Sequence, residues 1–181
     1  QGKHAEALAA IQSAKDHAPS APLLAAAGRI HLLRGALGEA ESAFRAALAI
    51  DKESVEALNR LGETLSKKGK LEEAKAAWND VVGIYERMSS DAAEEVSPED
   101  YVEMGLALVS LNRFKEANDV MLSSARDKDE KNPALLLESG RIFLAKYNFP
   151  DSRDYLKEAI DQNRRFADAL VVLAANYLAD F

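Results

Sequence analysis

The sequence predicts an all-α protein built from repeated pairs of helices, and two observations support this fold class. Apolar residues recur at intervals of three and four along nearly the whole chain, which is the spacing of one helix face, and strand-like runs are almost absent. The sequence also resembles itself when it is shifted by 34 residues. A fixed period with a helical pattern inside it indicates stacked helical hairpins, and we expect about ten helices.

Composition limits the partners that the protein could have. The 181 residues are 48% apolar, as expected for a chain that folds around a core. A net charge of -7 disfavours the broad basic surface that nucleic acids require, so no nucleic-acid partner is expected. No run of 18 apolar residues occurs, so membrane insertion is not expected either. The chain lacks cysteine, which excludes disulfides, and nothing in it indicates a cellular compartment.

The 34-residue period is clearest in the first half of the chain, where small and large residues recur in register. The aligned pairs are Gly28 with Gly62, Gly35 with Gly69, Ala40 with Ala74, and Phe44 with Trp78. Later copies keep the same frame more loosely, and Asn112 and Tyr147 replace the second of these glycines. We therefore expect the turn between the two helices to be less well defined in those copies.

The repeat frame divides the chain into a single array, described here from its beginning to its end. It predicts the second helix of an incomplete repeat at 1–19, full repeats at 21–54 and 55–88, an acidic insert at 89–97, full repeats at 98–131 and 133–166, and the first helix of an incomplete repeat at 167–181. Helix-start signals support two of these boundaries. Ser97 before Pro98 and Asn132 before Pro133 each place a capping side chain ahead of a proline that suits the first helical position.

This pattern resembles the tetratricopeptide repeat, a helix-turn-helix unit of 34 residues, over almost the whole chain. The resemblance implies an α-α superhelix, a solenoid whose concave face is formed by the first helices. Pro19 is the only repeat-ending proline in its usual place. The alanine-rich helices and loosely kept repeats suggest a bacterial protein. The chain begins without a methionine, and we expect it to be a piece of a longer protein.

The recurring glycine inside the first helix needs a physical reason, because glycine costs roughly 1 kcal/mol there relative to alanine. We expect Gly62 to lie where the second helix crosses the first, with Ala74 opposite it and with Leu65 and Trp78 on either side. A large residue in place of Gly62 should then separate the two helices.

The segment SSDAAEEVSPED, which spans the insert and the start of the third full repeat, carries five acidic residues and no basic one. We expect the helix that contains Trp78 to continue to about Ser89 and to be followed by an exposed loop. An alternative interpretation is that this acidic loop docks a basic partner.

Catalytic chemistry has little support in the sequence. His4, His17 and His31 lie far apart, none has a second ligand at metal-binding spacing, and they are interpreted as surface or helix-end residues. No nucleophile, phosphate-loop or dinucleotide motif occurs, so no enzyme activity, cofactor or metal is expected within these residues.

The family resemblance places a binding groove along the first helices, at places two, five, nine and twelve counted from the first residue of each helix. These residues are polar in the second full repeat and become apolar later in the chain. The predicted groove residues are Arg29, Asn59, Glu63, Val102, Leu106, Leu137, Arg141 and Val171. One interpretation is that they bind an apolar or amphipathic segment of a protein partner. The other is that the aliphatic residues among them are buried between neighbouring first helices.

Taken together, the sequence predicts a non-enzymatic scaffold for protein-protein interaction. A second hypothesis is a docking or regulatory arm of a larger enzyme, such as a peptidase or kinase, whose catalytic domain lies outside these residues. The helix expected at 167–181 is apolar on nearly every face, so self-association through the exposed terminal helices is also expected.

Overall fold

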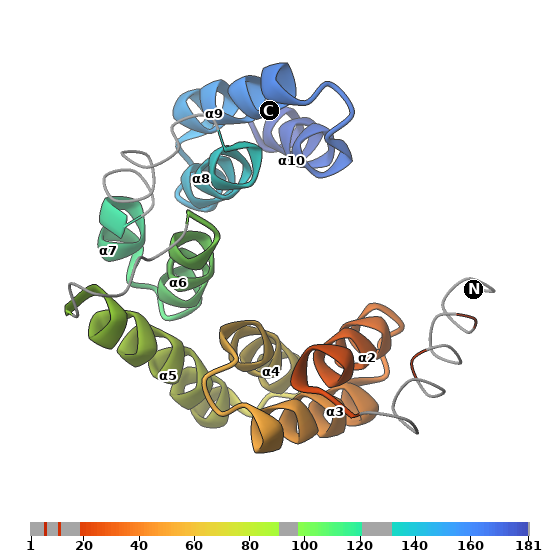
Figure 1. Cartoon of the computed structure of the whole chain (residues 1–181). Helices are drawn as coiled ribbons and strands as arrows, with labels where there is room; N and C mark the ends of the chain where they lie inside the picture. The colour runs from red at the N-terminus through yellow and green to blue at the C-terminus, as the bar shows by residue number, and fades with distance from the viewer. Residues whose placement is uncertain (1–5, 7–10, 12–18, 91–97, 121–131, 181) are drawn as a thin grey trace. The chain divides into compact units, whose positions relative to one another are not determined.

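The structure is a computed structural model that describes residues 6, 11, 19–90, 98–120 and 132–180. The regular elements in these ranges are all helices, which confirms the all-α class (Figure 1). They are α2 (Ala21–Leu33), α3 (Leu37–Ile50), α4 (Val55–Lys67), α5 (Leu71–Ser90), α6 (Pro98–Ser110), α7 (Phe114–Asp119), α8 (Pro133–Ala145), α9 (Phe149–Gln162) and α10 (Ala167–Ala179). The helix expected before residue 19 lies largely outside the described residues.

The chain divides into two compact units, unit 1 (Gln1–Ile84) and unit 2 (Tyr85–Phe181), which we describe separately. In unit 1, α3 packs against α2 and α4, and α2 contacts α4. In unit 2, α6 packs against α7, α8 packs against α9, and α10 contacts both α8 and α9. The first helices α6 and α8 also contact each other. Each unit is therefore made of helix pairs whose first helices lie side by side (Figure 1).

The glycine inside the first helix lies under a large side chain of the second helix in the pairs α2–α3, α4–α5 and α8–α9, as expected of the crossing point. A methyl group added to Gly28 would lie 2.7 Å from the Phe44 ring, and one added to Gly62 would lie closer still to the Trp78 indole nitrogen. These gaps are too short for any side chain. The indole of Trp78 covers Gly62 directly, and Ala74, which is predicted to lie opposite the glycine, is fully buried.

In unit 2 the same crossing has a polar reinforcement. An added methyl on Gly140 would lie 2.6 Å from Leu156 and 3.3 Å from the carbonyl oxygen of Ser152. The hydroxyl of Ser152 donates a hydrogen bond of 2.8 Å to the carbonyl oxygen of Gly140, and Ser152 is fully buried. The hydrogen bond satisfies a buried polar pair at the point where the two backbones approach.

The turn between the two helices has one backbone conformation in all four described pairs. Gly35, Gly69, Asn112 and Tyr147 have φ values of 73°, 78°, 60° and 58°. In each turn the residue after this one donates its N–H to a carbonyl in the last turn of the first helix, as Asn148 does to Phe143. The expected blurring of the turn at Asn112 and Tyr147 was therefore wrong, because these residues adopt the left-handed conformation in spite of their side chains.

The predicted helix boundaries agree with the structure. α6 begins at Pro98 and α8 at Pro133, where the Asn132 side chain accepts hydrogen bonds from two backbone N–H groups at 3.0 and 3.3 Å. α5 continues to Ser90, which confirms the helical extension beyond Trp78. The loop expected after it, at 91–97, lies outside the described residues.

A further link connects two of the second helices, α3 and α9, to the end of the following first helix. Glu41 on α3 pairs with Lys68, the C-cap of α4, and Arg153 on α9 pairs with Asp180, the C-cap of α10. Both pairs are 27 residues apart in sequence, and their charges are reversed. Between α9 and α10, the buried Asn176 amide also donates to the carbonyl oxygen of Phe149 at 3.1 Å.

Candidate functional site

The first-helix face, meaning places five, nine and twelve of each first helix, separates into a buried row and an accessible one. Place five is buried in α2, α4 and α8, where Ala25, Asn59 and Leu137 are 1%, 6% and 4% exposed. Leu137 belongs to the core cluster that also contains Leu156 and Ala169. Leu137 therefore packs against α9 and against the next first helix, α10, so the second interpretation of the aliphatic residues applies to it.

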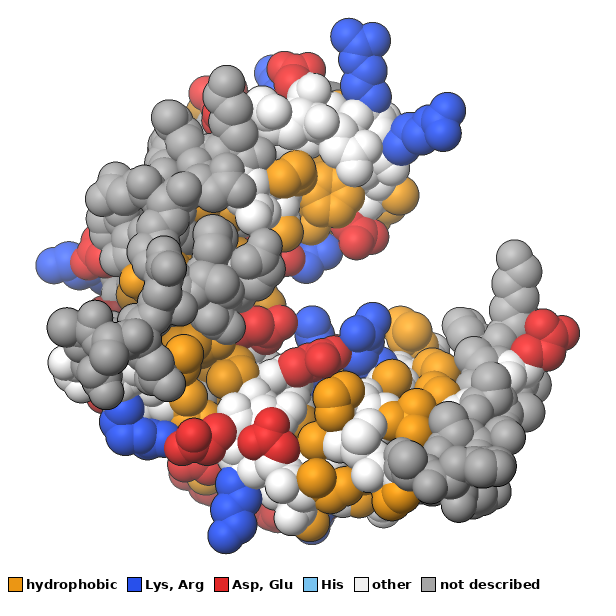
Figure 2. All heavy atoms as spheres, in the orientation of Figure 1, with side chains coloured by type: hydrophobic (Ala, Val, Ile, Leu, Met, Phe, Trp, Pro, Cys, Tyr) orange, Lys and Arg blue, Asp and Glu red, His pale blue; other side chains and the backbone are white. Residues whose placement is uncertain are grey.

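Places nine and twelve remain accessible; in unit 1, place nine carries charges that are already paired, and place twelve holds the half-buried Leu32 and Ser66. Arg29 on α2 is exposed and binds Glu56 on α4 at 2.9 Å. Glu63 accepts from Arg60 at 3.2 Å and lies 3.7 Å from Lys67. Figure 2 shows acidic and basic side chains together on unit 1. A partner that docked here would have to desolvate ion pairs that the protein has already made.

Unit 1 also holds a buried carboxylate behind this face. Glu41 is 6% exposed and is contacted by Lys68 at 2.5 Å, Arg45 at 2.9 Å and Lys70 at 3.1 Å. The hydrogen bond from Lys68 is the main reason that the pKa of Glu41 falls to about 2, with Lys70 and Arg45 adding to it against the opposing effect of burial. Arg45 and Lys70 also contact Glu73 on α5, so the network joins three helices.

In unit 2 the accessible places are largely aliphatic. Leu106 and Val109 of α6 and Leu144 of α8 are half-buried, and Leu178 of α10 is 77% exposed. The predicted residue Val102 is half-buried at place five of α6. Figure 2 shows hydrophobic side chains gathered over the region of α10.

One charged residue interrupts this aliphatic row. Arg141 of α8 is exposed, and it is held by Glu138 at 2.6 Å on the same helix. The guanidinium therefore stays at the surface beside the aliphatic side chains.

α10 differs from the other first helices in how much of it is covered. Val171, at place five, is 68% exposed, whereas the corresponding residues of α2, α4 and α8 are buried. Leu170 and Tyr177 are 46% and 45% exposed, although the corresponding Leu58 and Leu65 of α4 are 6% and 2% exposed. Only Ala169 and Asn176 of α10 are buried.

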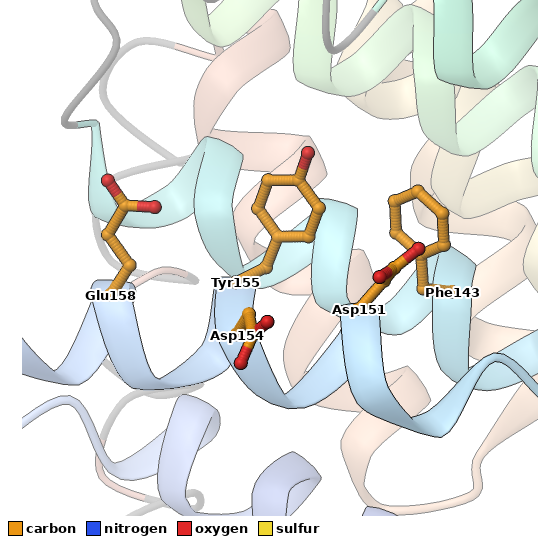
Figure 3. Close-up of a pocket in the computed structure, with 5 residues that line it drawn as sticks. All are labelled: Phe143, Asp151, Asp154, Tyr155 and Glu158. Atoms are coloured by element: carbon orange, nitrogen blue, oxygen red, sulfur yellow. The ribbon is translucent and has the colours of Figure 1, made fainter.

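A surface pocket of about 320 Å³ lies on unit 2, away from this row (Figure 3). Its lining includes Phe143 of α8 and four residues of α9: Asp151, Asp154, Tyr155 and Glu158. The two rings stack with their centroids 5.4 Å apart. Figure 3 shows the three carboxylates pointing in different directions, and Asp151 already accepts a hydrogen bond from Asn148 at 2.7 Å. The carboxylates do not converge on one point where a ligand could be held.

Within the described ranges, no group of three or more histidine or acidic residues is arranged to hold a metal ion. His31 lies in the last turn of α2, as expected of a helix-end residue, and His4 and His17 lie outside the described residues. Among the described helices, none combines the length and apolar character needed to cross a lipid bilayer.

Comparison with protein-family models gives two matches, both described as Tetratricopeptide repeat. One covers residues 31–85 and the other covers residues 102–169, and together they span more than half of the chain. The search of curated proteins gave no match.

Solved structures with the same fold include TTC0263, a thermophilic TPR protein in Thermus thermophilus. It has a TM-score of 0.72 and 17% identity, over 98% of this chain and 92% of that one. The APC/C hetero-tetramer Cut9-Hcn1 has a TM-score of 0.65 and 18% identity. The match covers 97% of this chain and only 33% of that one. PilW, a widely conserved type IV pilus biogenesis factor, has a TM-score of 0.62 and 18% identity, over 96% of this chain and 78% of that one. At these identities the likeness shows the fold alone.

Proposed function

The chain belongs to the tetratricopeptide repeat family, and on that basis we propose that it binds an apolar or amphipathic segment of a partner protein on the first-helix face of unit 2. Repeats of this family generally mediate protein-protein interaction and are generally non-catalytic. The observation that carries the choice of surface is the difference between the units at places nine and twelve.

This difference is supported by residues that share one position in the repeat. Place nine holds Arg29 and Glu63 in unit 1, where both are in ion pairs, and it holds Leu106 in α6. Place twelve is aliphatic in all three first helices of unit 2, whereas in unit 1 it holds Leu32 in α2 and Ser66 in α4. Because an apolar segment gains free energy mainly by removing apolar surface from water, the aliphatic row offers it far more than the charged one.

Arg141 gives the partner a polar anchor within this surface. Its side chain is 44% exposed, and its pairing with Glu138 leaves other guanidinium N–H groups available as donors. A segment with apolar side chains on one edge and an acidic or carbonyl oxygen near its middle therefore fits the surface best. The same surface would serve the chain as a free scaffold or as the docking arm of a larger enzyme.

Peptide selection tests the proposal without requiring that the partner be identified first. Random peptides displayed on phage are selected against the chain, and the enriched peptides are then titrated by calorimetry. We expect apolar or amphipathic peptides, and we expect Leu178→Ser to weaken binding at least about tenfold without changing the melting temperature, because Leu178 is mostly exposed.

The matched control is Arg29→Ser, which also changes an exposed residue of the first-helix face, in unit 1. It should leave the affinity of the same peptides within about twofold, since a residue outside the contact contributes little. Peptides that lose affinity on Arg29→Ser and keep it on Leu178→Ser would refute the assignment to unit 2.

A further inference from the structure

The turn between α8 and α9 exposes an aromatic ring on a backbone conformation that disfavours it. Tyr147 lies at place 15 of its repeat, where unit 1 has Gly35 and Gly69, and its φ is 58°. The tyrosine therefore costs free energy that glycine would not cost, and because it is 81% exposed the core gains little from it. Strained residues of this kind are concentrated at ligand-binding sites.

The exposure of Tyr147 is a property of the turn. Place 15 is exposed in all four described turns, and the turns at Gly35 and Asn112 are each followed by a further described pair of helices. The next first helix after Tyr147, α10, likewise leaves it exposed. The ring is therefore accessible because of its place in the turn.

Two further aromatic rings and a cation extend this position into a strip, which we call the turn strip. The ring of Tyr147 meets the ring of Phe149 edge-on, with centroids 6.2 Å apart. The ammonium of Lys146, the C-cap of α8, lies 5.5 Å from the centre of the Phe114 ring of α7. The turn strip thus consists of Phe114, Lys146, Tyr147 and Phe149. Lys146 and Tyr147 are exposed, and the two phenylalanines are half-buried.

Lys146 occupies a position at which other repeats form a charged link. Such a link joins place 21 of one repeat, counted from the first residue of its first helix, to place 14 of the next, as Glu41 to Lys68. For Lys146, at place 14, the residue at place 21 of the preceding repeat is Asn118, which carries no charge. Among the described residues, the ammonium of Lys146 contacts the Phe114 ring, and no carboxylate pairs with it. An ion-pairing position is therefore left open beside the exposed tyrosine.

We propose that the turn strip binds an extended acidic segment of a partner protein. A side-chain carboxylate of the segment pairs with Lys146, and an apolar side chain close to it in the segment packs on the Tyr147 ring. The Phe114 ring excludes water from one side of the ammonium, and an ion pair is stronger where less water surrounds it. A tyrosine ring supplies a large contact area with only two side-chain torsions to fix, which makes it a typical anchor.

The proposal requires stability and binding to change in opposite directions at one residue. Tyr147→Gly removes the ring from the turn strip and gives the turn the residue that unit 1 has. Binding should therefore weaken while the melting temperature rises. Tyr147→Asn is a second variant with the same purpose, because it copies Asn112 of the turn between α6 and α7, which has the same left-handed backbone.

Peptide selection with subtraction tests the proposal. Random peptides displayed on phage through their C-termini, so that carboxylates come only from side chains, are selected on the full 181-residue chain. Clones that also bind Tyr147→Gly are removed. We expect the remaining peptides to combine aspartate or glutamate with a nearby apolar residue. In calorimetric titration Tyr147→Asn should weaken their binding at least about tenfold, with the fold retained in circular dichroism.

The cation has a test of its own. Lys146→Gln should weaken binding of these peptides at least about fivefold and should make the affinity less sensitive to salt, because the ion pair is lost. The matched control is Lys157→Gln, which removes an exposed lysine of α9 outside the turn strip and should change the affinity less than about twofold. The proposal is overturned if no clone survives the subtraction, if the surviving peptides are basic, or if Lys146→Gln and Lys157→Gln have equal effects.

This inference does not depend on the proposed function. Tyr147→Asn is expected to leave unchanged the binding of peptides that require Leu178, and Leu178→Ser is expected to leave unchanged the binding of the acidic peptides. Failure of one proposal is therefore distinguishable from failure of the other.

Discussion

Units 1 and 2 share one helical frame and have different surfaces. In both, glycine at place eight lies under a large side chain of the second helix, as in the pairs of Gly62 with Trp78 and Gly140 with Leu156. In unit 1, place nine of the first helices carries paired charges and place twelve holds one leucine and one serine, whereas in unit 2 these places are mainly aliphatic. The comparison indicates that packing fixes places four and eight, whereas places nine and twelve are free to carry function.

The links between neighbouring pairs differ in the same way. Glu41 is buried and shared among three cations, whereas Arg153 pairs with the single carboxylate of Asp180 at a more exposed site. The two links have opposite polarity because the C-cap residue is a lysine in α4 and an aspartate in α10. Lys68 also interacts favourably with the negative end of the α4 helix dipole. Asp180 has the same sign of charge as the negative end of the α10 dipole, so its favourable contact comes from Arg153.

The largest expected effect tests the shared frame. Gly62→Leu should lower the free energy of unfolding by about 3 kcal/mol or more, because even a methyl group would overlap the Trp78 indole. Gly140→Leu should do the same in unit 2, where Leu156 is in the way. Urea unfolding followed by circular dichroism measures both. Gly83→Ala is the control, since nothing lies within 4 Å of the added methyl. If Gly62→Leu keeps the stability of the parent chain, the explanation that Trp78 packing requires glycine at this position would be wrong.

A smaller effect should distinguish the two charged links. Glu41→Gln should cost about 2 kcal/mol near neutral pH, because it removes the ionised acceptor from three cations. Arg153→Gln should cost about 1 kcal/mol, since its partner Asp180 is more exposed. The measurement is urea unfolding of both variants beside the parent chain. Equal losses in the two units would contradict this distinction.

The depressed pKa of Glu41 also predicts a pH dependence with a definite sign. Its pKa is about 2 in the folded chain, against 4.5 for an unperturbed glutamate, so the unfolded state binds the proton more readily. The stability that Glu41 contributes should therefore be complete above pH 4.5 and should be lost as the pH falls from 4.5 towards 2. Over that window the free energy of unfolding of Glu41→Gln should decline less than that of the parent. Parallel declines would count against the network.

The smallest effect concerns the turns. Tyr147 adopts a left-handed backbone where unit 1 has glycine, so Tyr147→Gly should raise the free energy of unfolding by about 1 kcal/mol. The reverse change, Gly69→Ala, should lower it by about the same amount. Thermal melting of the two variants is sufficient to measure both. If Tyr147→Gly melts below the parent chain, the edge-on contact of Tyr147 with Phe149 matters more than the backbone strain.

The sequence was sufficient for the frame, because repeated spacing reports directly which residues share a helix face. The sequence was not sufficient to predict which side chain of the neighbouring helix contacts each residue. The Trp78 indole lies directly over Gly62, whereas the spacing predicts Trp78 only beside the crossing, because side-chain direction depends on rotamers that spacing does not reveal. Tyr147 keeps the turn because the backbone hydrogen bonds that close it do not depend on the side chain.

The candidate site was only partly predictable for a related reason. Val102 and Leu137 both occupy place five of a first helix, yet Leu137 is buried and Val102 is half-buried. Burial at place five depends on how closely the next first helix packs, which one helix alone does not specify. The network around Glu41 does leave a signal in the sequence, namely opposite charges 27 and 29 residues apart along the chain.

The most direct test of the difference between the units is a reciprocal exchange of the accessible residues. One variant gives unit 2 the residues of α4 through Ala175→Glu and Leu178→Ser, and the other gives α4 the apolar character of unit 2 through Glu63→Leu and Ser66→Leu. Calorimetric titration with the selected peptides should show binding lost in the first variant and retained in the second. Binding that survives in the first variant, at an unchanged melting temperature, would contradict the account.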